Sequence, residues 1–286
     1  MLTLILQALI NGVLLGGVFA LLSSGLSLYF GVARVANSAH AAFAILASHL
    51  AFWLYTLWGI DPLVSVLAVV PILFITGVIY QRILIIPVIQ QPPLTKLALT
   101  FFVAIGVENA MILCWKNIYR SIAVPYSMVS ISLGEISIPL IRLVTFLISI
   151  ITLILLMVII KYTKVGKAIR ATADNREAAQ ICGININYIY MLTAGISFSL
   201  AGIGGVILGL LFAFYPAVHV FWIGKLYTIV ILGGIASIGG SFIAAFIIGF
   251  LDAFIGTFTS IMWSSIVSWV ILLLTLLLRR GGLFGR

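Results

Sequence analysis

Apolar runs long enough to cross a membrane repeat along the whole chain, separated by short polar breaks. A helix satisfies its own backbone hydrogen bonds in lipid, and it needs about 20 apolar residues to cross the hydrocarbon core. The runs at 2–31, 63–86 and 138–160 meet this requirement. No run shows the strict alternation over about 10 residues that is typical of a membrane β-barrel. The pattern predicts an all-α polytopic membrane helix bundle of about eight or nine transmembrane helices.

The composition excludes an ordinary soluble protein, because only 7% of the 286 residues are charged and 64% are hydrophobic. Soluble domains carry about 25% charged residues. The net charge of +9 indicates membrane orientation rather than nucleic-acid binding, since Lys and Arg accumulate on cytoplasmic loops. Cys114 and Cys182 lack the spacing of a metal or disulfide framework. We predict a single transmembrane domain over 1–286, with lipid contact, no nucleic-acid partner, no metal and no cofactor.

Two segments interrupt the apolar pattern where a broken helix is expected. Residues 32–41 place Asn37 and His40 between two apolar runs. They form either a loop at the membrane surface or a broken helix lining a polar path, because unwound backbone at membrane depth must be buried or line a cavity. The second segment, 233–240 (GGIASIGG), divides an apolar stretch too long for one span. Its four glycines predict two shorter helices that meet at the break.

The distribution of Lys and Arg orients the bundle. If residues 161–185 are cytoplasmic, alternation along the chain also places the C-terminus in the cytoplasm. Residues 116–137, with mixed charges, then form an external loop with a small hairpin or a surface helix. The first 33 residues carry no side-chain charge, so two topologies stay open. Nine crossings put the N-terminus outside, and eight crossings follow if 32–58 is re-entrant.

Few residues could carry chemistry. The sequence has no P-loop and no catalytic constellation, so we predict no catalytic residue and a membrane transporter or channel without its own motor. Glu108 and Asp252 lie inside apolar runs, where a carboxylate is by default a functional candidate. For Glu108 we favour pairing with Lys116 or Arg120 near the helix end. A stand-alone secondary transporter that uses Glu108 or Asp252 as a proton site is an alternative.

The segment Lys161–Asn185 is a polar island in this apolar chain and must lie on one face of the membrane. Five of the 15 Lys and Arg residues fall between Lys161 and Arg176. Its lysines are expected to continue the preceding helix beyond the membrane. Asp174 and Glu177 form a D-x-x-E capping box, which predicts a new helix over about 175–182.

Gly183 suits the stop of that short helix. Ala178 and Ala179 give it small apolar contacts and few large anchors. Such a helix binds lipid poorly, so it is better suited to a groove on a partner protein.

The sequence GKAIRATADNREAAQICGIN (166–185) resembles the cytoplasmic coupling loop of ABC importer permeases, in the version found in the branched-chain amino acid family. Three further segments resemble family motifs. Residues 37–40 resemble N-x-A-H-G with Ala41 in place of Gly, 233–237 resemble G-G-I-G-S with Ala236 in place of Gly, and 282–285 match the G-L-F-G ending. The matching residues of the coupling loop are Gly166, Ala168, Arg170, Ala171, Ala173, Ala178, Ala179, Gly183, Ile184 and Asn185.

The resemblance implies a multi-pass permease subunit of an ABC importer in the bacterial inner membrane, which translocates branched-chain or related amino acids. Urea, short amides or other amino acids are alternative substrates. The implied partners are a second homologous permease subunit, two cytoplasmic ATP-binding subunits and an external substrate-binding protein. The implied coupling residues are Gly166, Arg170, Ala171, Asp174, Glu177, Ala178, Ala179 and Gly183. Candidates for the translocation path are Asn37, His40, Gly233, Gly234 and Ser237.

Overall fold

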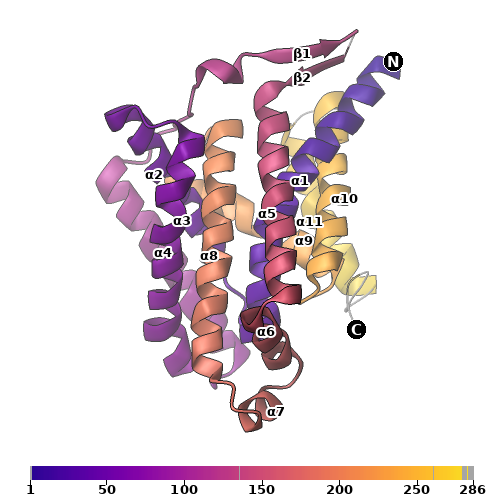
Figure 1. The fold of residues 1–286 in the computed structure, drawn as a ribbon. Coiled ribbons are helices and arrows are strands. Elements are labelled where there is room, and N and C mark those ends of the chain that lie inside the picture. The colour runs from indigo at the N-terminus through magenta and orange to yellow at the C-terminus, as the bar shows by residue number, and fades with distance from the viewer. Residues whose placement is uncertain (1, 135, 260, 279–281, 283–286) are drawn as a thin grey trace.

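The computed structural model describes residues 2–134, 136–259, 261–278 and Gly282. This part of the chain is a helix bundle with one small hairpin (Figure 1). Its α-helices are α1 (Leu2–Ala33), α2 (His40–Trp58), α3 (Pro62–Tyr80), α4 (Pro93–Trp115), α5 (Leu140–Tyr162), α6 (Lys164–Asp174), α7 (Arg176–Ile181), α8 (Ile186–Leu211), α9 (His219–Gly233), α10 (Ile238–Phe258) and α11 (Ile261–Leu278).

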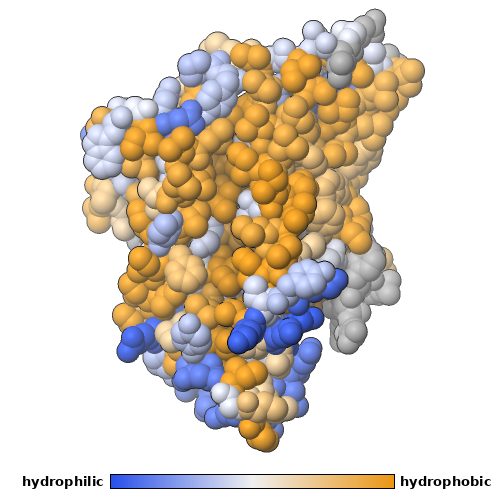
Figure 2. Space-filling view, viewed as in Figure 1, coloured by the Kyte–Doolittle hydropathy of each residue, from blue (hydrophilic) through white to orange (hydrophobic). Residues whose placement is uncertain are grey.

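Eight helices of the described chain are long and apolar enough to cross a membrane, and α11 adds the shorter apolar stretch Ile266–Leu278. The prediction of an all-α polytopic bundle is therefore confirmed. A broad apolar band covers the middle of the face seen in Figure 2, and hydrophilic side chains gather below it over α6 and α7. The face of α5 in this band exposes Ile151, Ile154 and Leu155, as expected of side chains that contact lipid.

The strands β1 (Ser130–Leu133) and β2 (Ile136–Pro139) form an antiparallel hairpin at one end of the bundle. Gly134 takes a left-handed φ of 66° at the turn, and the next residue, Glu135, lies outside the described residues. The hairpin expected within 116–137 is confirmed. We call this side of the molecule the hairpin end, and the side that carries α6 and α7 the basic end.

Long-range contacts settle the direction of the first two helices. The side-chain amide of Gln7, near the start of α1, donates to the Ser137 carbonyl at 2.6 Å and accepts from its N–H at 3.1 Å. The N-terminus therefore lies at the hairpin end (Figure 1). At the far end of α2, Tyr55 donates to the carbonyl of Ala123 at 3.3 Å, again at the hairpin end. The segment 32–58 thus continues across the bundle and is not re-entrant.

The helix α1 packs closely against α10 through small residues. A Cβ built on Gly12 would stand 2.7 Å from the Cα of Phe250, and one on Gly16 would stand 2.9 Å from the Cα of Phe246. Small residues let helix backbones approach closely in lipid, where dispersion contacts replace the hydrophobic effect. The two helices are antiparallel, since Gly31, near the other end of α1, faces Ala236, just before α10.

The interruption at 233–240 divides the apolar stretch into α9 and α10, as predicted. Gly233 ends α9, and Gly234 follows with a φ of 96°. A Cβ on Gly233 would stand 2.5 Å from the amide nitrogen of Ser241, so the two helix ends meet backbone to backbone. Only glycine leaves room for this contact.

Candidate functional site

The polar island 161–185 folds into two short helices set off from α5 by a break at Thr163. Thr163 is extended, with φ −88° and ψ 159°, and its N–H still bonds the Ile159 carbonyl at 3.2 Å. Its hydroxyl accepts from the N–H of Gly166 at 3.0 Å and so caps α6. The expectation that the lysines continue α5 as one rigid helix is wrong, because Thr163 ends one helix and begins the next.

Gly166 allows α6 to fold back against the end of α5. A Cβ at this position would stand 2.6 Å from the carbonyl carbon of Ile160. Ile169, on the same helix, is buried at 2% exposure and lines a small cavity with Leu28 and Val32 of α1. Arg170 points outward and donates to the carbonyl of Lys161 at 3.3 Å. The helix α6 therefore rests on α1 and α5, and its charged side chains face solvent.

The cap of α7 is Asn175, not Asp174. The Asn175 side chain accepts from the N–H of Ala178 at 3.1 Å, and its backbone is extended. Asp174 is instead the last residue of α6, because the N–H of Asn175 still bonds the Ala171 carbonyl at 3.0 Å. The predicted D-x-x-E capping box is wrong, and Glu177 lies within the first turn of α7.

The end of α7 matches the predicted stop. Gly183 has a φ of 82°. Its N–H bonds the Gln180 carbonyl at 3.0 Å, and the N–H of Ile184 bonds the Ala179 carbonyl at 3.1 Å. These two bonds form a Schellman motif, which satisfies the last carbonyls of the helix and favours glycine at the left-handed position.

The exposed surface of α7 differs from the one expected. Ala179 is only 3% exposed and packs against its own chain, whereas Ala178 and Cys182 are exposed. Ile181 is 87% exposed, which is unusual for a large apolar side chain in a polar region. The outward face of α7 is thus Ala178, Ile181 and Cys182, and Ala179 belongs to the interior.

Arg176 connects α7 to the bundle. Its guanidinium donates to the carbonyl of Ala33, at the end of α1, at 3.4 Å and lies 5.7 Å from the ring centre of Tyr190 in α8. Beside it opens a polar groove of about 660 Å³. The groove is lined by Arg34, Ile89, Gln90, Pro93, Lys96, Asp174, Asn175, Arg176 and Glu177.

Asn37 lies in a buried polar junction between α1 and α2. Its side-chain oxygen accepts from the N–H of Ala39 and from the Tyr80 hydroxyl, both at 3.1 Å. Its Nδ2 has no hydrogen-bond partner among the described residues. Next to it, Thr100 accepts from the N–H of Ser38 at 3.2 Å and so ties the junction to α4.

His40, the first residue of α2, is fully buried. Its Nε2 lies 3.2 Å from the carbonyl of Leu22, and its Nδ1 lies 3.4 Å from the Ser197 hydroxyl. Ser197 in turn donates to the Gly25 carbonyl at 2.8 Å. The junction is therefore a broken segment inside the bundle rather than a surface loop, and it joins α1, α2 and α8.

The two Gly-to-Ala departures from the expected motifs differ in conformation. Ala41 lies within α2, where alanine is favourable. Ala236 has a φ of 70°, a left-handed conformation that costs a non-glycine residue about 1–2 kcal/mol. Ser237 follows and caps α10 by accepting from the N–H of Gly240 at 3.0 Å. The Gly-rich break is thus a strained, capped turn at the basic end.

The sequence model of one family, described as "Branched-chain amino acid transport system / permease component", matches residues 8–276. The chain belongs to this family. The family membership that the motifs implied is therefore confirmed over nearly the whole chain.

Relatives of this permease come from both bacteria and an archaeon. The high-affinity branched-chain amino acid transport system permease proteins LivH of Salmonella typhimurium and BraD of Pseudomonas aeruginosa are each 28% identical to it, over 98% of this chain and 96% of theirs. A probable branched-chain amino acid transport permease protein LivH of Methanocaldococcus jannaschii is 27% identical, over 96% of this chain and 91% of its own length. No solved structure matches the permease significantly.

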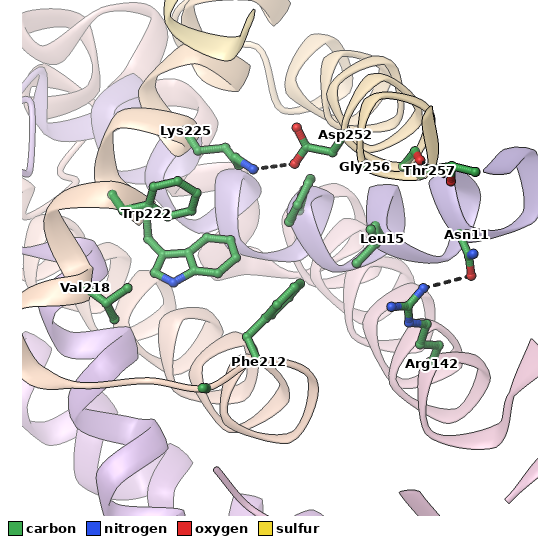
Figure 3. Close-up of a pocket in the computed structure, with 14 residues that line it drawn as sticks. Asn11, Leu15, Arg142, Phe212, Val218, Trp222, Lys225, Asp252, Gly256 and Thr257 are labelled. Carbon is green, nitrogen blue, oxygen red and sulfur yellow. Dashed lines mark hydrogen bonds and ion pairs between the residues drawn. The ribbon is translucent and has the colours of Figure 1, made fainter. Parts of the chain in front are cut away.

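Lys225 is a functional candidate that sequence reasoning missed. It forms an ion pair with Asp252 between α9 and α10, and both side chains are almost fully buried (Figure 3). The sequence feature that could have revealed Lys225 is a single lysine inside an apolar run that also contains an intramembrane carboxylate. The pair lines a cavity of the permease that also contains Asn11, Arg142, Phe212 and Trp222.

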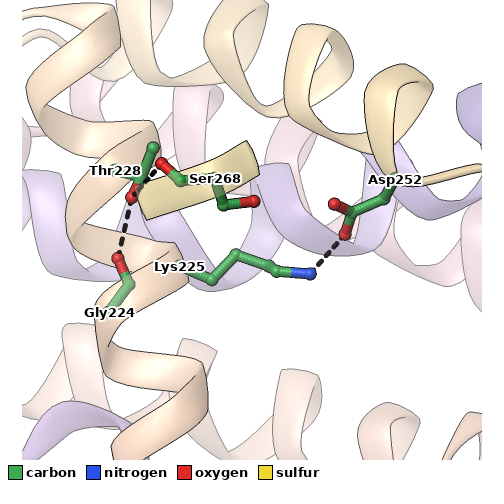
Figure 4. Close-up of polar contacts among 5 residues, drawn as sticks. All are labelled: Gly224, Lys225, Thr228, Asp252 and Ser268. Carbon is green, nitrogen blue, oxygen red and sulfur yellow. Dashed lines mark hydrogen bonds and ion pairs between the residues drawn. The ribbon is translucent and has the colours of Figure 1, made fainter. Parts of the chain in front are cut away.

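The helix α9 presents different residues to its two neighbours (Figure 4). Lys225 reaches Asp252 of α10, whereas the Thr228 hydroxyl donates to the carbonyls of Gly224 and of Ser268, at 3.0 and 3.4 Å. Ser268 belongs to α11. Lys225 is therefore directed away from the α9–α11 contact and toward the cavity.

Glu108 also has a basic partner, but not the one expected. Its Oε2 lies 2.9 Å from Nε2 of His219 at the start of α9, and His219 is buried. Arg120 instead stacks over the rings of Phe52 and Trp53 and donates to the Trp115 carbonyl at 3.0 Å. The expected pairing of Glu108 with Lys116 or Arg120 is wrong, because α9 brings a histidine to the carboxylate.

Proposed function

We propose that this permease is the membrane-spanning subunit of an ABC importer that translocates branched-chain amino acids across the inner membrane. Two cytoplasmic ATP-binding subunits drive it, a second homologous permease subunit pairs with it, and an external binding protein delivers substrate. The observation that carries the proposal is the exposed face of α7 at the basic end. Family membership and the branched-chain amino acid names of its relatives support the substrate class.

The face of α7 has the features of a docking knob. The helix is short, it is capped at both ends, and Ile181 projects beside the small Ala178. A polar groove with the side chains of Arg34, Lys96 and Arg176 lies next to it. An ATP-binding subunit that grips this knob gains an apolar anchor and charged contacts around it.

Movement of α7 has a physical route into the bundle. Because α5 is broken at Thr163, the route is not a rigid extension of α5. It runs instead through Arg176 to the end of α1 and to α8, and through the buried Ile169 of α6 to α1. In this proposal, ATP binding to the partner subunits selects one of two arrangements of these helices, which opens the permease to one side of the membrane.

The orientation follows from the positive-inside rule. Lys96, Lys161, Arg170 and Arg176 gather at the basic end, which we assign to the cytoplasm. The N-terminus and the hairpin are then external. The C-terminus is cytoplasmic in this proposal. The arginines expected to mark it, 279, 280 and 286, lie outside the described residues, as does most of the G-L-F-G motif.

In this proposal, the candidate path residues contact substrate in only one of the two arrangements of the helices. Asn37 and His40 are closed off from solvent in this conformation, but Nδ2 of Asn37 remains an available donor for a substrate carboxylate. We propose that they line the path in the other arrangement, together with the break formed by Gly233, Gly234 and Ser237.

The test is uptake of labelled leucine by cells that lack their own branched-chain uptake and co-express the permease with its partner subunits. We expect uptake that depends on ATP hydrolysis by the partners, with urea and short amides as weak competitors. Uptake that persists when the ATP-binding subunits are inactivated would favour a secondary transporter. Absence of branched-chain uptake in an assembled complex would overturn the proposed substrate.

The coupling role is tested with Ala178→Glu. This change places a charge on the exposed face of α7 and leaves the buried Ala179 intact. We expect loss of ATPase co-purification and at least a tenfold loss of uptake, with normal membrane insertion. The matched control is Asn117→Glu, which adds the same charge at the hairpin end and should change neither. Unchanged uptake and ATPase binding in Ala178→Glu would exclude α7 as the coupling helix.

A further inference from the structure

A cavity of about 360 Å³ lies among α1, α5, α9 and α10, toward the hairpin end. Asn11 and Leu15 of α1 border it, and both follow closely on Gln7, which bonds the hairpin. Cavities that hold small-molecule ligands are roughly 300–1,000 Å³ and combine apolar walls with a few converging polar groups. The volume suits one small molecule.

The polar wall of this cavity is an ion pair. Lys225 is 6% exposed and Asp252 9% exposed, and they come from two different helices. Burying charges at membrane depth is costly, and intramembrane charges mark ion and substrate pathways by default. Lys225 also lies 5.0–5.7 Å from the ring centres of Phe19, Phe221 and Trp222. These rings stabilise the ammonium even when Asp252 turns to another partner.

The opposite wall holds a second basic group. The guanidinium of Arg142 donates to Oδ1 of Asn11 at 2.8 Å, across the cavity from Lys225 and Asp252 (Figure 3). The apolar side chains of Leu15, Phe212 and Val218 also line the cavity, and Leu15 lies between the two polar pairs in Figure 3. The cavity is thus lined by one carboxylate, two cations and several apolar side chains.

We propose that this cavity is a binding subsite for a zwitterionic α-amino acid with an apolar side chain. The proposal rests on the proposed transport function and assigns it a site within the subunit. The ligand opens the ion pair, so that Lys225 binds the carboxylate and Asp252 binds the ammonium group. Because the ligand is neutral overall, each charged wall group exchanges one partner for another and no net charge is buried. Leu15, Phe212 and Val218 contact the aliphatic side chain.

The excess of cations over carboxylates predicts a selectivity. Of the two half-ligands of leucine, 4-methylpentanoate keeps only the carboxylate and 3-methylbutylamine keeps only the amine. We expect the carboxylate to compete with leucine better than the amine does, because Lys225 and Arg142 both favour an anion. If the Lys225–Asp252 pair served only to hold α9 to α10, the two half-ligands would not differ in this way.

Binding is measured by the fluorescence of Trp222, which lines the cavity, in the purified full-length permease in lipid nanodiscs. Leucine should change the emission in the native sequence and should not do so in Trp222→Phe, which identifies the signal among the six tryptophans. The change in emission gives the dissociation constants of leucine and of both half-ligands.

Two variants test the assigned roles. Lys225→Met should weaken leucine binding at least tenfold and should not weaken the binding of 3-methylbutylamine, because its amine no longer competes with Lys225 for Asp252. Asp252→Asn should weaken leucine binding at least tenfold and should not weaken the binding of 4-methylpentanoate, because its carboxylate no longer competes with Asp252 for Lys225. Glu108→Gln alters the partly buried contact between Glu108 and His219 and is the matched control, with leucine binding within twofold of the native value. Equal loss of all three ligands in both variants would overturn the assignment.

A third variant retains the ion pair, so it tests the subsite even if the two charge variants fail to fold. Val218→Phe reduces the apolar space and should weaken leucine binding at least tenfold while alanine binds as before. Native leucine binding in Val218→Phe would overturn the subsite.

Leucine uptake by the assembled complex is measured in parallel. Uptake with no Trp222 response rejects only the subsite, whereas a response without uptake rejects the proposed transport function.

Discussion

Gly16 of α1 and Gly249 of α10 lie in direct backbone contact, since a Cβ built on Gly249 would stand 2.6 Å from the Cα of Gly16. The contact continues at Gly12, whose carbonyl oxygen would stand 2.9 Å from the same Cβ. At Gly249 there is no room for a side chain between the two helices. The two glycines therefore set the distance between α1 and α10, and with it the position of Asp252 farther along α10.

Replacing Gly249 with Val should force α1 and α10 apart. Overpacking of a close contact costs about 1–3 kcal/mol, and we expect a lower unfolding temperature of the detergent-solubilised protein. Gly106→Val is the matched control, because a Cβ at Gly106 meets nothing within 4 Å. Equal thermal stability of the two variants would contradict the tight contact.

Removing the Asn175 cap should loosen α7. Loss of an N-cap side chain costs about 1 kcal/mol, so the amides of α7 should exchange with solvent roughly fivefold faster in Asn175→Ala. Hydrogen exchange read by mass spectrometry measures this change. Asp174→Ala is the control, since Asp174 ends α6 and does not cap α7. Faster exchange in Asp174→Ala than in Asn175→Ala would restore the capping box expected from the sequence.

Replacing Ala236 with Gly should stabilise the protein. Ala236 is exposed and has a φ of 70°, so glycine relieves a left-handed strain of about 1–2 kcal/mol at the expense of greater freedom in the unfolded chain. Ala41→Gly, at the other motif departure, should instead destabilise, because position 41 is helical. Thermal unfolding should show a higher unfolding temperature for Ala236→Gly and a lower one for Ala41→Gly. A lower unfolding temperature for Ala236→Gly would contradict the strain.

Replacing Thr100 with Val should weaken the polar junction. The change leaves the buried N–H of Ser38 without its acceptor, which costs about 1–3 kcal/mol. Thr76→Val is the control, since among the described residues the Thr76 hydroxyl bonds only the carbonyl of Ile72 in its own helix. Thermal unfolding should separate the two variants. If both lose the same stability, Thr100 does not support the junction.

Local sequence patterns were sufficient for the membrane-spanning helices and for the end of α7, but not for the break between α5 and α6 at Thr163. Apolar runs predicted the spans, GGIASIGG predicted the break between α9 and α10, and Gly183 predicted the end of α7. The break and the helix end depend on residues within about one or two helical turns, where backbone hydrogen bonding and glycine conformation decide the outcome. The roles of the coupling and path residues stay predictions until the variants are measured.

Where adjacent residues offered equivalent chemistry, the sequence could not choose between them. Asp174 and Asn175 are both good N-caps, and only the extent of α6 decides that Asn175 caps α7. The inward position of Ala179 likewise depends on how α7 rests on the bundle.

The sequence by itself determined that this chain is a bundle of membrane-spanning helices with a polar segment at one face. In lipid the backbone N–H and C=O groups need hydrogen-bond partners within the protein, and a helix supplies them. Only the tertiary structure decided that Lys225 meets Asp252 and that His219 meets Glu108. These pairs lie on different helices, and their meeting depends on which helix faces pack together. The glycine contacts between α1 and α10 help to set that packing, and no local periodicity encodes it.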